Sequence, residues 1–209
     1  RAAIAMTARY DLEILKNLGD ELRYGENPHQ RGWVSGSSSL GSAQLLQGKA
    51  MSYNNYLDSD FGLRALSLFA QPAVVIVKHG IPSGLACDQS IESAFDKALA
   101  CDPISAFGGV IVANRELDGS LARKISQSFF EVIVAPGFSE AARLELGAKK
   151  NLRLIDIGID HSLSSPIVNV REISGGYLFQ ERDHEIEKDD PASWILVSGP
   201  AIEDFTDLQ

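Results

Sequence analysis

Two side chains that can move protons stand next to each other at the end of a strand-forming run. The run AVVIVK ends on Lys78, His79 follows at once, and the turn-forming residues Gly80, Pro82 and Gly84 come directly behind. Histidine exchanges protons near neutral pH, and a lysine beside it can accept a proton or stabilise a developing oxyanion. In sheets of alternating strands and helices, ligands usually bind outside the carboxyl ends of the strands. The pair is therefore a candidate catalytic site, and an exposed strand end is the alternative.

Two polar segments earlier in the chain have the composition of an anion-binding site. LRYGENPHQ, residues 22–30, contains Arg23 and Tyr24, and an arginine can hold a phosphate through two parallel hydrogen bonds. QGKAMSYNNYLDSD, residues 47–60, carries Asn55 just before a predicted helix, where free backbone N–H groups favour anions. The alternatives are a surface turn with an ion pair for the first segment and a helix N-cap for the second.

A third segment, DPISAFGGVIVANRELD at residues 102–118, has two glycines at the opening of a strand. Gly108 and Gly109 carry no side chain, so a flat ligand can approach the backbone there. The chain contains neither GxGxxG nor GxxxxGK[ST]. The sequence therefore predicts no phosphate-binding loop of the nucleotide-cofactor kind.

The composition excludes several classes of protein. The 209 residues are 44% hydrophobic and 22% charged, and the formal net charge of −9 argues against a broad nucleic-acid-binding surface. No apolar run approaches the roughly 18–20 residues of a membrane span, and the first residues do not resemble a secretory signal. We therefore expect a cytoplasmic protein that binds neither nucleic acid nor membrane. Cys87 and Cys101 lie outside any CxxC or Cys/His cluster, so they are predicted to be small core residues.

Helical and strand patterns alternate along the chain. Helices are predicted over residues 1–20 and 57–70, after Asp88, and over 119–129 and 139–149 with caps near Asp118 and Ser139. Strands are predicted over 73–78 and within GGVIVANREL, EVIVAPG and NLRLIDIG. Near-continuous apolar strands separated by helices indicate a three-layer α/β/α fold, with a mostly parallel sheet covered on both faces. REISGGYLFQERD is predicted to be a strand or hairpin, and DHEIEKDDP an acidic connection.

Five segments, taken in this order, resemble one enzyme family. LRYGENPHQ, GKAMSYNN, VIVKHGIPSG, DPISAFGGVIVANRELD and EVIVAP are similar to the transformylase part of the bifunctional AICAR transformylase/IMP cyclohydrolases. The resemblance covers residues 22–209, and it implies that residues 1–21 are a helical connection from a cyclohydrolase domain. It also implies a cytidine-deaminase-like α/β unit, the first of two in a transformylase domain.

The resemblance implies a reaction and roles for particular residues. The family transfers a formyl group from 10-formyltetrahydrofolate to the amine of 5-aminoimidazole-4-carboxamide ribonucleotide (AICAR), and then closes the ring to IMP in its other domain. By their places in the matching segments, Lys78 is the implied proton acceptor and His79 is implied to stabilise the transition state. The implied nucleotide-binding residues are Arg23, Tyr24, Asn55, Gly108 and Glu131.

The same resemblance implies partners and limits. The family forms homodimers with active sites between subunits, and AICAR and the folate are its ligands. No metal is expected, because the zinc-binding motifs of the deaminases are missing. Where many members have KHANPCG this chain has KHGIPSG, so Ile81 replaces a polar residue. The chain looks cut at both ends and the family's domain continues past Gln209, so we expect this chain alone to be inactive. A noncatalytic nucleotide-binding or dimerisation fragment is the alternative.

Overall fold

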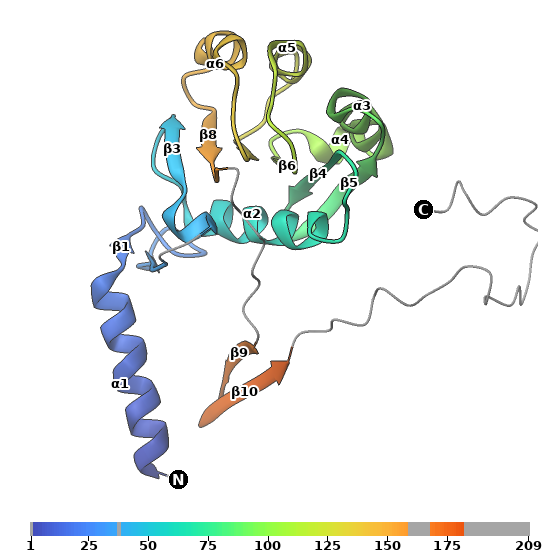
Figure 1. The fold of residues 1–209 in the computed structure, drawn as a ribbon. Coiled ribbons are helices and arrows are strands. Elements are labelled where there is room, and N and C mark those ends of the chain that lie inside the picture. The colour runs from blue at the N-terminus through green and yellow to red at the C-terminus, as the bar shows by residue number, and fades with distance from the viewer. Residues whose placement is uncertain (1, 37–38, 159–167, 182–209) are drawn as a thin grey trace, which may run out of the picture. The chain divides into compact units, whose positions relative to one another are not determined.

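The computed structural model describes residues 2–36, 39–158 and 168–181, and Figure 1 traces their path. The chain divides into two compact units, Arg1–Ser165 and Pro166–Gln209. Each unit is described by itself.

A six-stranded sheet forms the centre of the first unit, in the order β3-β8-β7-β6-β4-β5. The strands are β3 (Gln44–Gln47), β4 (Ala73–Lys78), β5 (Ile81–Cys87), β6 (Val110–Ala113), β7 (Val132–Ala135) and β8 (Arg153–Asp156). The strands β6, β7 and β8 pair in parallel, whereas the β3–β8, β4–β6 and β4–β5 pairings are antiparallel. Four strands, β5 to β8, therefore point one way and β3 and β4 point the other way. This confirms an α/β fold with a mixed, mostly parallel sheet.

The reversed direction of β4 decides where its carboxyl end lies. Val77 of β4 pairs with Val110 at the start of β6, and Val110 pairs in turn with Val132 at the start of β7. Arg153, the first residue of β8, is next in the same row. The carboxyl end of β4 thus lies beside the amino ends of the three parallel strands. We call this side the amino edge of the sheet, and the side where β6 to β8 end the carboxyl edge.

Helices cover both faces of the sheet. The helices of this layer arrangement are α2 (Tyr53–Leu66), α3 (Ile91–Cys101), α4 (Pro103–Ala106), α5 (Gly119–Ser126) and α6 (Glu140–Gly147). Figure 1 shows α2 across one face and α3, α5 and α6 over the other. Successive strand residues point to opposite faces, so Val75 and Val77 join the core on the α2 side, and Val74 and Ile76 join the core on the other side. The predicted three layers are confirmed, while the likeness to cytidine deaminases stays a prediction.

Short polar side chains fix where three of the helices begin. Asp118 and Ser139 accept hydrogen bonds from backbone N–H groups in the first turns of α5 and α6, as predicted. Helix α2 begins at Tyr53, earlier than predicted, because Ser52 and Asn55 form a reciprocal capping box. The cap extends the helix toward the amino edge of the sheet.

The cap of α3 differs from the prediction. Ser90 is the N-cap, whereas Asp88 accepts hydrogen bonds from the Gln89 N–H and the Ser93 hydroxyl and pairs with Lys97 at 3.1 Å. The hydroxyl of Ser93, followed by the amide of Gln89 and the ammonium of Lys97, lowers the pKa of Asp88 to about 2. Asp88 therefore anchors the approach to α3 without capping it.

Strand β5 was not predicted from the sequence. Only His79 and Gly80 form the turn between β4 and β5, so the prediction that Pro82 and Gly84 also turn the backbone is wrong. An edge strand tolerates proline, and the β4–β5 pairing shifts register next to Pro82. Gly84 is required by packing, because a Cβ there would lie 1.9 Å from the carbonyl oxygen of Ala98 in α3.

The N-terminal segment begins with a helix, as predicted. Its elements are α1 (Ala2–Leu18), β1 (Asp20–Glu21), β2 (Trp33–Val34) and the 3-10 turn η1 (Ser39–Ser42). Tyr10 and Leu18 of α1 keep 68% and 77% of their surface exposed. That this helix is a connection from another domain stays a prediction.

The described part of the second unit is an antiparallel hairpin of β9 (Val168–Ile173) and β10 (Gly176–Glu181). It confirms the hairpin predicted there, and the predicted acidic connection at residues 183–191 lies outside the described residues. Of the two cysteines, Cys87 is half-buried, but Cys101 is exposed at the end of α3, so the core prediction is wrong for it. No described helix is both long and apolar enough to cross a membrane.

Candidate functional site

Lys78 lies at the amino edge of the sheet, where its ammonium group meets the loop before β6. It is the half-buried last residue of β4, and its Nζ donates a 2.7 Å hydrogen bond to the carbonyl oxygen of Phe107. The expectation that the pair lies at the carboxyl ends of the strands is right for β4 and wrong for the parallel strands. Because β4 runs against β6, Lys78 meets residues that precede the parallel strands.

His79 and Gly80 form a two-residue hairpin turn with positive φ at both positions, 55° and 74°. A hairpin turn of the I′ type requires this geometry, and glycine suits its second position. One carboxylate accepts both turn amides: Asp58 Oδ2 accepts from the His79 N–H at 3.2 Å, and Oδ1 accepts from the Gly80 N–H at 2.7 Å. The His79 residue is exposed, so its imidazole is open to a ligand.

Glu131 and Asn55 join the start of β7 to the start of α2. Asn55 is 5% exposed, its Oδ1 accepts from the Ser52 N–H at 3.1 Å, and its Nδ2 donates to Glu131 Oε2 at 3.1 Å. Both ends of the Asn55 amide are therefore engaged within the protein. The predicted N-cap role, the alternative for this segment, is also confirmed through the capping box.

Gly108 follows the short helix α4, and its backbone is left-handed with φ 75°. Its N–H donates to the Phe129 carbonyl oxygen at 2.8 Å, which ties this loop to the one before β7. Asp102 caps α4, and the Ser105 hydroxyl, followed by backbone N–H groups, lowers the pKa of Asp102. The loop that carries Gly108 is thus held at both ends beside Lys78.

Arg23 and Tyr24 lie on the loop between β1 and β2. The Arg23 guanidinium stands 4.9 Å from the centre of the Tyr24 ring, and in the described ranges no carboxylate pairs with Arg23. The ion pair of this segment is formed by Arg31 and Glu21 at 2.8 Å. Their hydrogen bond is the main cause that lowers the pKa of the Glu21 carboxyl and raises the pKa of the Arg31 guanidinium. Arg23 Nη2 donates to the Tyr24 hydroxyl at 3.5 Å, and its other donors stay open to a ligand.

A cavity of about 210 Å³ connects this loop to the His79 turn. Its lining residues are Glu26, Asn54, Leu57, Asp58, Phe61, His79 and Gly80. Asn54 Nδ2 donates to the Glu26 carbonyl oxygen at 3.1 Å and so joins α2 to the loop. The loop of Arg23 therefore lies against the same helix that supports the turn.

Two residues at this edge have contacts that the sequence analysis did not predict. Arg153 is 9% exposed, and its Nε donates to the carbonyl oxygens of Lys49 and Ala50 at 3.1 and 3.3 Å. A charged residue at the head of an apolar strand was the available signal. Asp58 had no comparable signal, because its contact with His79 spans 21 positions along the chain.

The structure gathers five of the seven predicted site residues at the amino edge: Lys78, His79, Asn55, Gly108 and Glu131. The other two, Arg23 and Tyr24, lie on the adjoining loop. The roles of all seven residues stay predictions. Within residues 2–36, 39–158 and 168–181, no group of three or more His, Cys, Asp or Glu side chains could hold a metal ion.

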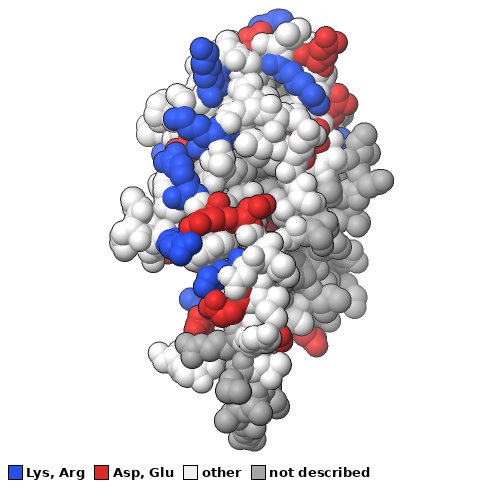
Figure 2. Space-filling view, turned by 90° about the vertical axis from the view of Figure 1, so that its left-hand side faces the viewer, with Lys and Arg blue, Asp and Glu red and all other residues white. Residues whose placement is uncertain are grey.

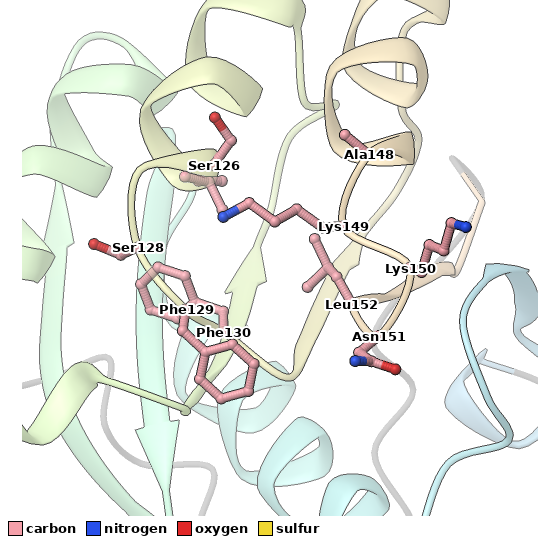
Figure 3. Close-up of a pocket in the computed structure, with 10 residues that line it drawn as sticks. Ser126, Ser128, Phe129, Phe130, Ala148, Lys149, Lys150, Asn151 and Leu152 are labelled. Atoms are coloured by element: carbon pink, nitrogen blue, oxygen red, sulfur yellow. The ribbon is translucent and has the colours of Figure 1, made fainter.

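A larger hollow of about 380 Å³ lies between the ends of α5 and α6 (Figure 3). Phe129 and Phe130 form one wall, Lys149 extends across the hollow toward Ser126, and Lys150 points away from it. None of the predicted site residues lines this hollow.

The charged side chains of one face are interleaved. Figure 2 shows Lys and Arg in a broken file that Asp and Glu interrupt. Among the described residues of that face, acidic side chains interrupt the positive charge. Nonspecific nucleic-acid binding needs a broad, continuous positive surface.

The chain belongs to the AICARFT/IMPCHase bienzyme family, whose profile matches residues 2–209. Three relatives carry the name bifunctional purine biosynthesis protein PurH. The Cutibacterium acnes protein is 43% identical over 193 residues, 90% of this chain and 37% of that protein. The Corynebacterium glutamicum protein is 44% identical over 192 residues, 88% and 36% of the two chains. The Aquifex aeolicus protein is 44% identical over 169 residues, 78% and 32% of the two chains.

The chain thus spans about a third of the length of these relatives, between 32% and 37%. Among solved structures, a putative formate dehydrogenase accessory protein from Desulfotalea psychrophila aligns with a TM-score of 0.40 at 11% identity. That alignment covers 47% of this chain and 50% of the other. A likeness this weak carries no conclusion.

Proposed function

We propose that this chain supplies part of a transformylase active site, in which 10-formyltetrahydrofolate formylates the amine of AICAR during purine biosynthesis. Membership of the bienzyme family supports the reaction class. One structural observation carries the assignment to this region: Lys78, Gly108 and Glu131, from three separate segments, meet at the amino edge. The pairing of β4, β6 and β7 brings these three residues to neighbouring strand ends, where one ligand can contact all of them.

The reaction defines what the side chains must do. The amine nitrogen attacks the formyl carbon, a C–N bond forms, and the carbonyl electron pair moves onto oxygen. The intermediate then collapses, the bond from carbon to N10 of the folate breaks, the amine nitrogen loses a proton and N10 gains one. The amine is a poor nucleophile, because its lone pair is delocalised into the ring and the carboxamide. Proton removal and oxyanion stabilisation each contribute roughly 10²-fold or more in rate.

Lys78 and His79 are the residues we assign to those tasks. The bond from Lys78 to the Phe107 carbonyl uses one of the three donors of an ammonium group, so two remain for an oxyanion. As a proton acceptor, Lys78 must instead be the neutral amine. His79 is exposed beside the cavity and can relay a proton in either arrangement. Either residue can take the proton, and the other then stabilises the oxyanion.

The remaining predicted residues bind the nucleotide in this proposal. Arg23 clamps the phosphate with Tyr24 beside it, and the bare backbone at Gly108 lets the flat base approach. Asn55 donates to Oε2 of Glu131, so the other carboxylate oxygen, Oε1, can accept a hydrogen bond from the ligand. Because both ends of the Asn55 amide are engaged, Asn55 acts by orienting Glu131.

The proposal extends to the assembly. The complete enzyme is a cytoplasmic homodimer with active sites between subunits and a cyclohydrolase domain in the same polypeptide. The 209 residues alone are then inactive, since they span about a third of the relatives. Measurable formyl transfer by this chain alone would contradict this part of the proposal.

The test uses a full-length protein that carries these residues, with both substrates saturating. Lys78→Ala and His79→Ala should each lower kcat by roughly 10²-fold or more, as expected for groups that act in the transition state. The matched control is Lys124→Ala, which removes a lysine of α5 that pairs with Glu92 and Asp96 of α3 at 2.8 and 2.5 Å, on the sheet face opposite α2. Thermal melts show whether each variant is folded. Near wild-type turnover in both site variants would overturn the proposal.

A further inference from the structure

The His79 turn is held by a carboxylate from another element. Asp58 lies in α2, and its two oxygens accept the N–H groups of His79 and Gly80 at 3.2 and 2.7 Å. These are the two central residues of the turn, so one side chain satisfies both of its amides. The sequence separation is 21 and 22 positions, and the contact is therefore set by the packing of α2 on the sheet.

His79 is the only described residue other than glycine with a positive φ, which is 55°. In the left-handed region the Cβ of an L-residue crowds the following carbonyl oxygen, so a histidine there needs support from its surroundings. A glycine would adopt the turn without that support. Keeping a histidine in this position makes its backbone depend on the acceptor that Asp58 provides.

The helix that carries Asp58 sits at a fixed height over the sheet. A Cβ added at Gly62 would lie 2.4 Å from Val112 Cγ2, which shows how closely α2 approaches β6. The capping box fixes the start of the same helix. The ring of Phe61 covers Gly80, since a Cβ added at Gly80 would lie 3.3 Å from that ring. Asp58 is half-buried between these contacts and also lines the cavity of about 210 Å³ that His79 lines.

We propose that Asp58 is a positioning residue, whose carboxylate holds the His79 turn so that the imidazole stays at the cavity. This inference rests on the proposed function of His79. Asp58 acts on the backbone, so it orients the histidine without touching the substrate. Its removal lets the turn relax toward negative φ and moves the imidazole away from the reacting atoms.

The kinetic test uses the full-length protein. Asp58→Ala should lower kcat about 10-fold with the KM for the nucleotide within about twofold, because positioning acts in the transition state. Asp58→Asn keeps a single acceptor oxygen, so its kcat should fall less. Asp60→Ala is the matched control: it removes a carboxylate of the same helix that pairs with Arg64 at 2.8 Å and does not touch the turn. Its kcat should be unchanged.

A double-mutant cycle separates positioning from general damage. In a His79→Ala background, Asp58→Ala should have almost no further effect on kcat, because the side chain that it positions is gone. A full 10-fold loss in that background would overturn the inference, as would an unchanged kcat for Asp58→Ala alone. If His79→Ala itself turns over normally, the proposed function of His79 fails instead.

A structural readout tests the contact independently of activity. Hydrogen exchange of the backbone amides in a peptide covering residues 79 and 80 should accelerate at least about 10-fold in Asp58→Ala, because both amides lose their acceptor. Unchanged exchange would show that the turn stands without Asp58, whatever the kinetics of the Lys78 and His79 variants.

Discussion

The two edges of the central sheet differ in whether the polar residues at their strand ends keep free donors and acceptors. At the carboxyl edge, Asn114 accepts from the Ala73 N–H at 2.8 Å and donates to the carbonyl oxygens of Phe69 and Gln71 at 3.1 and 2.7 Å. Arg115 next to it donates to two further carbonyl oxygens. At the amino edge, Lys78 makes one such bond, and His79 is exposed. Asn114 and Arg115 at the carboxyl edge hold loops, whereas Lys78 and His79 at the amino edge keep donors or acceptors open beside residues that hold the backbone, such as Arg153 and Asp58.

This difference shows that a polar residue at a strand end is not by itself a site. Both edges carry charged and amide side chains next to buried strands, and the sequence patterns look alike. What distinguishes them is whether the donors and acceptors are already matched within the protein. Variants at the two edges should therefore differ in whether they lose stability or activity.

Asn114→Ala should damage stability and spare catalysis. It removes an acceptor for the Ala73 N–H and two donors to loop carbonyls, so we expect a loss of about 2–3 kcal/mol in the free energy of unfolding. Denaturant titration measures the loss, and exposed Asn151→Ala is the control. A large fall in kcat of a folded Asn114 variant would remove the contrast between the edges.

Arg23→Ala should weaken nucleotide binding and leave stability unchanged. A phosphate clamp acts alike in the ground state and the transition state, so we expect the KM for the nucleotide to rise about 10-fold, or about 1.4 kcal/mol, with kcat nearly unchanged. The melting temperature should stay the same, because Arg23 is exposed. Arg123→Ala, another exposed arginine, is the control. An unchanged nucleotide affinity in a titration excludes Arg23 from the site.

Gly108→Ala tests the backbone of the amino edge. The added Cβ meets the Phe129 ring at 3.5 Å, an ordinary contact, so the penalty comes from the left-handed φ of 75°. We expect a loss of about 1 kcal/mol in unfolding free energy. If the base of the nucleotide rests on this backbone, the KM for the nucleotide also rises, and a KM at the wild-type value would mean that Gly108 is kept for its turn alone.

Asp88 at the carboxyl edge should make the stability of the fold depend on pH. Its pKa is lowered from 3.8 to about 2 in the folded protein, first by the Ser93 hydroxyl. A depressed carboxyl pKa stabilises the fold above the unfolded value, and this contribution is lost as the pH falls from about 4 to about 2. Melting temperatures of the wild type and Asp88→Asn should therefore converge across this window. A constant difference between pH 5 and pH 2 would contradict the assignment.

Much of the fold follows from local patterns in the sequence. The buried valine and isoleucine runs of β4, β6 and β7 are apolar on both faces, which only a sheet covered on two sides accommodates. The caps at Asp118 and Ser139 act within their own first turns, so the sequence alone locates those helix starts. Strand β5 was missed because its Pro82 and Gly84 are tolerated only through an edge position and a close helix, neither of which is a local property.

For the candidate site, local patterns identify which residue types stand in which segments: a Lys-His pair, an Arg-Tyr pair, a Gly-Gly opening and a glutamate before a strand. That these segments meet at the amino edge follows from the folded sheet, because the antiparallel pairing of β4 with β6 reverses the strand that carries Lys78. Tertiary packing also makes Asn55 face Glu131 and Asp58 hold His79. Strand direction and helix height depend on contacts between distant residues, and no local pattern encodes them.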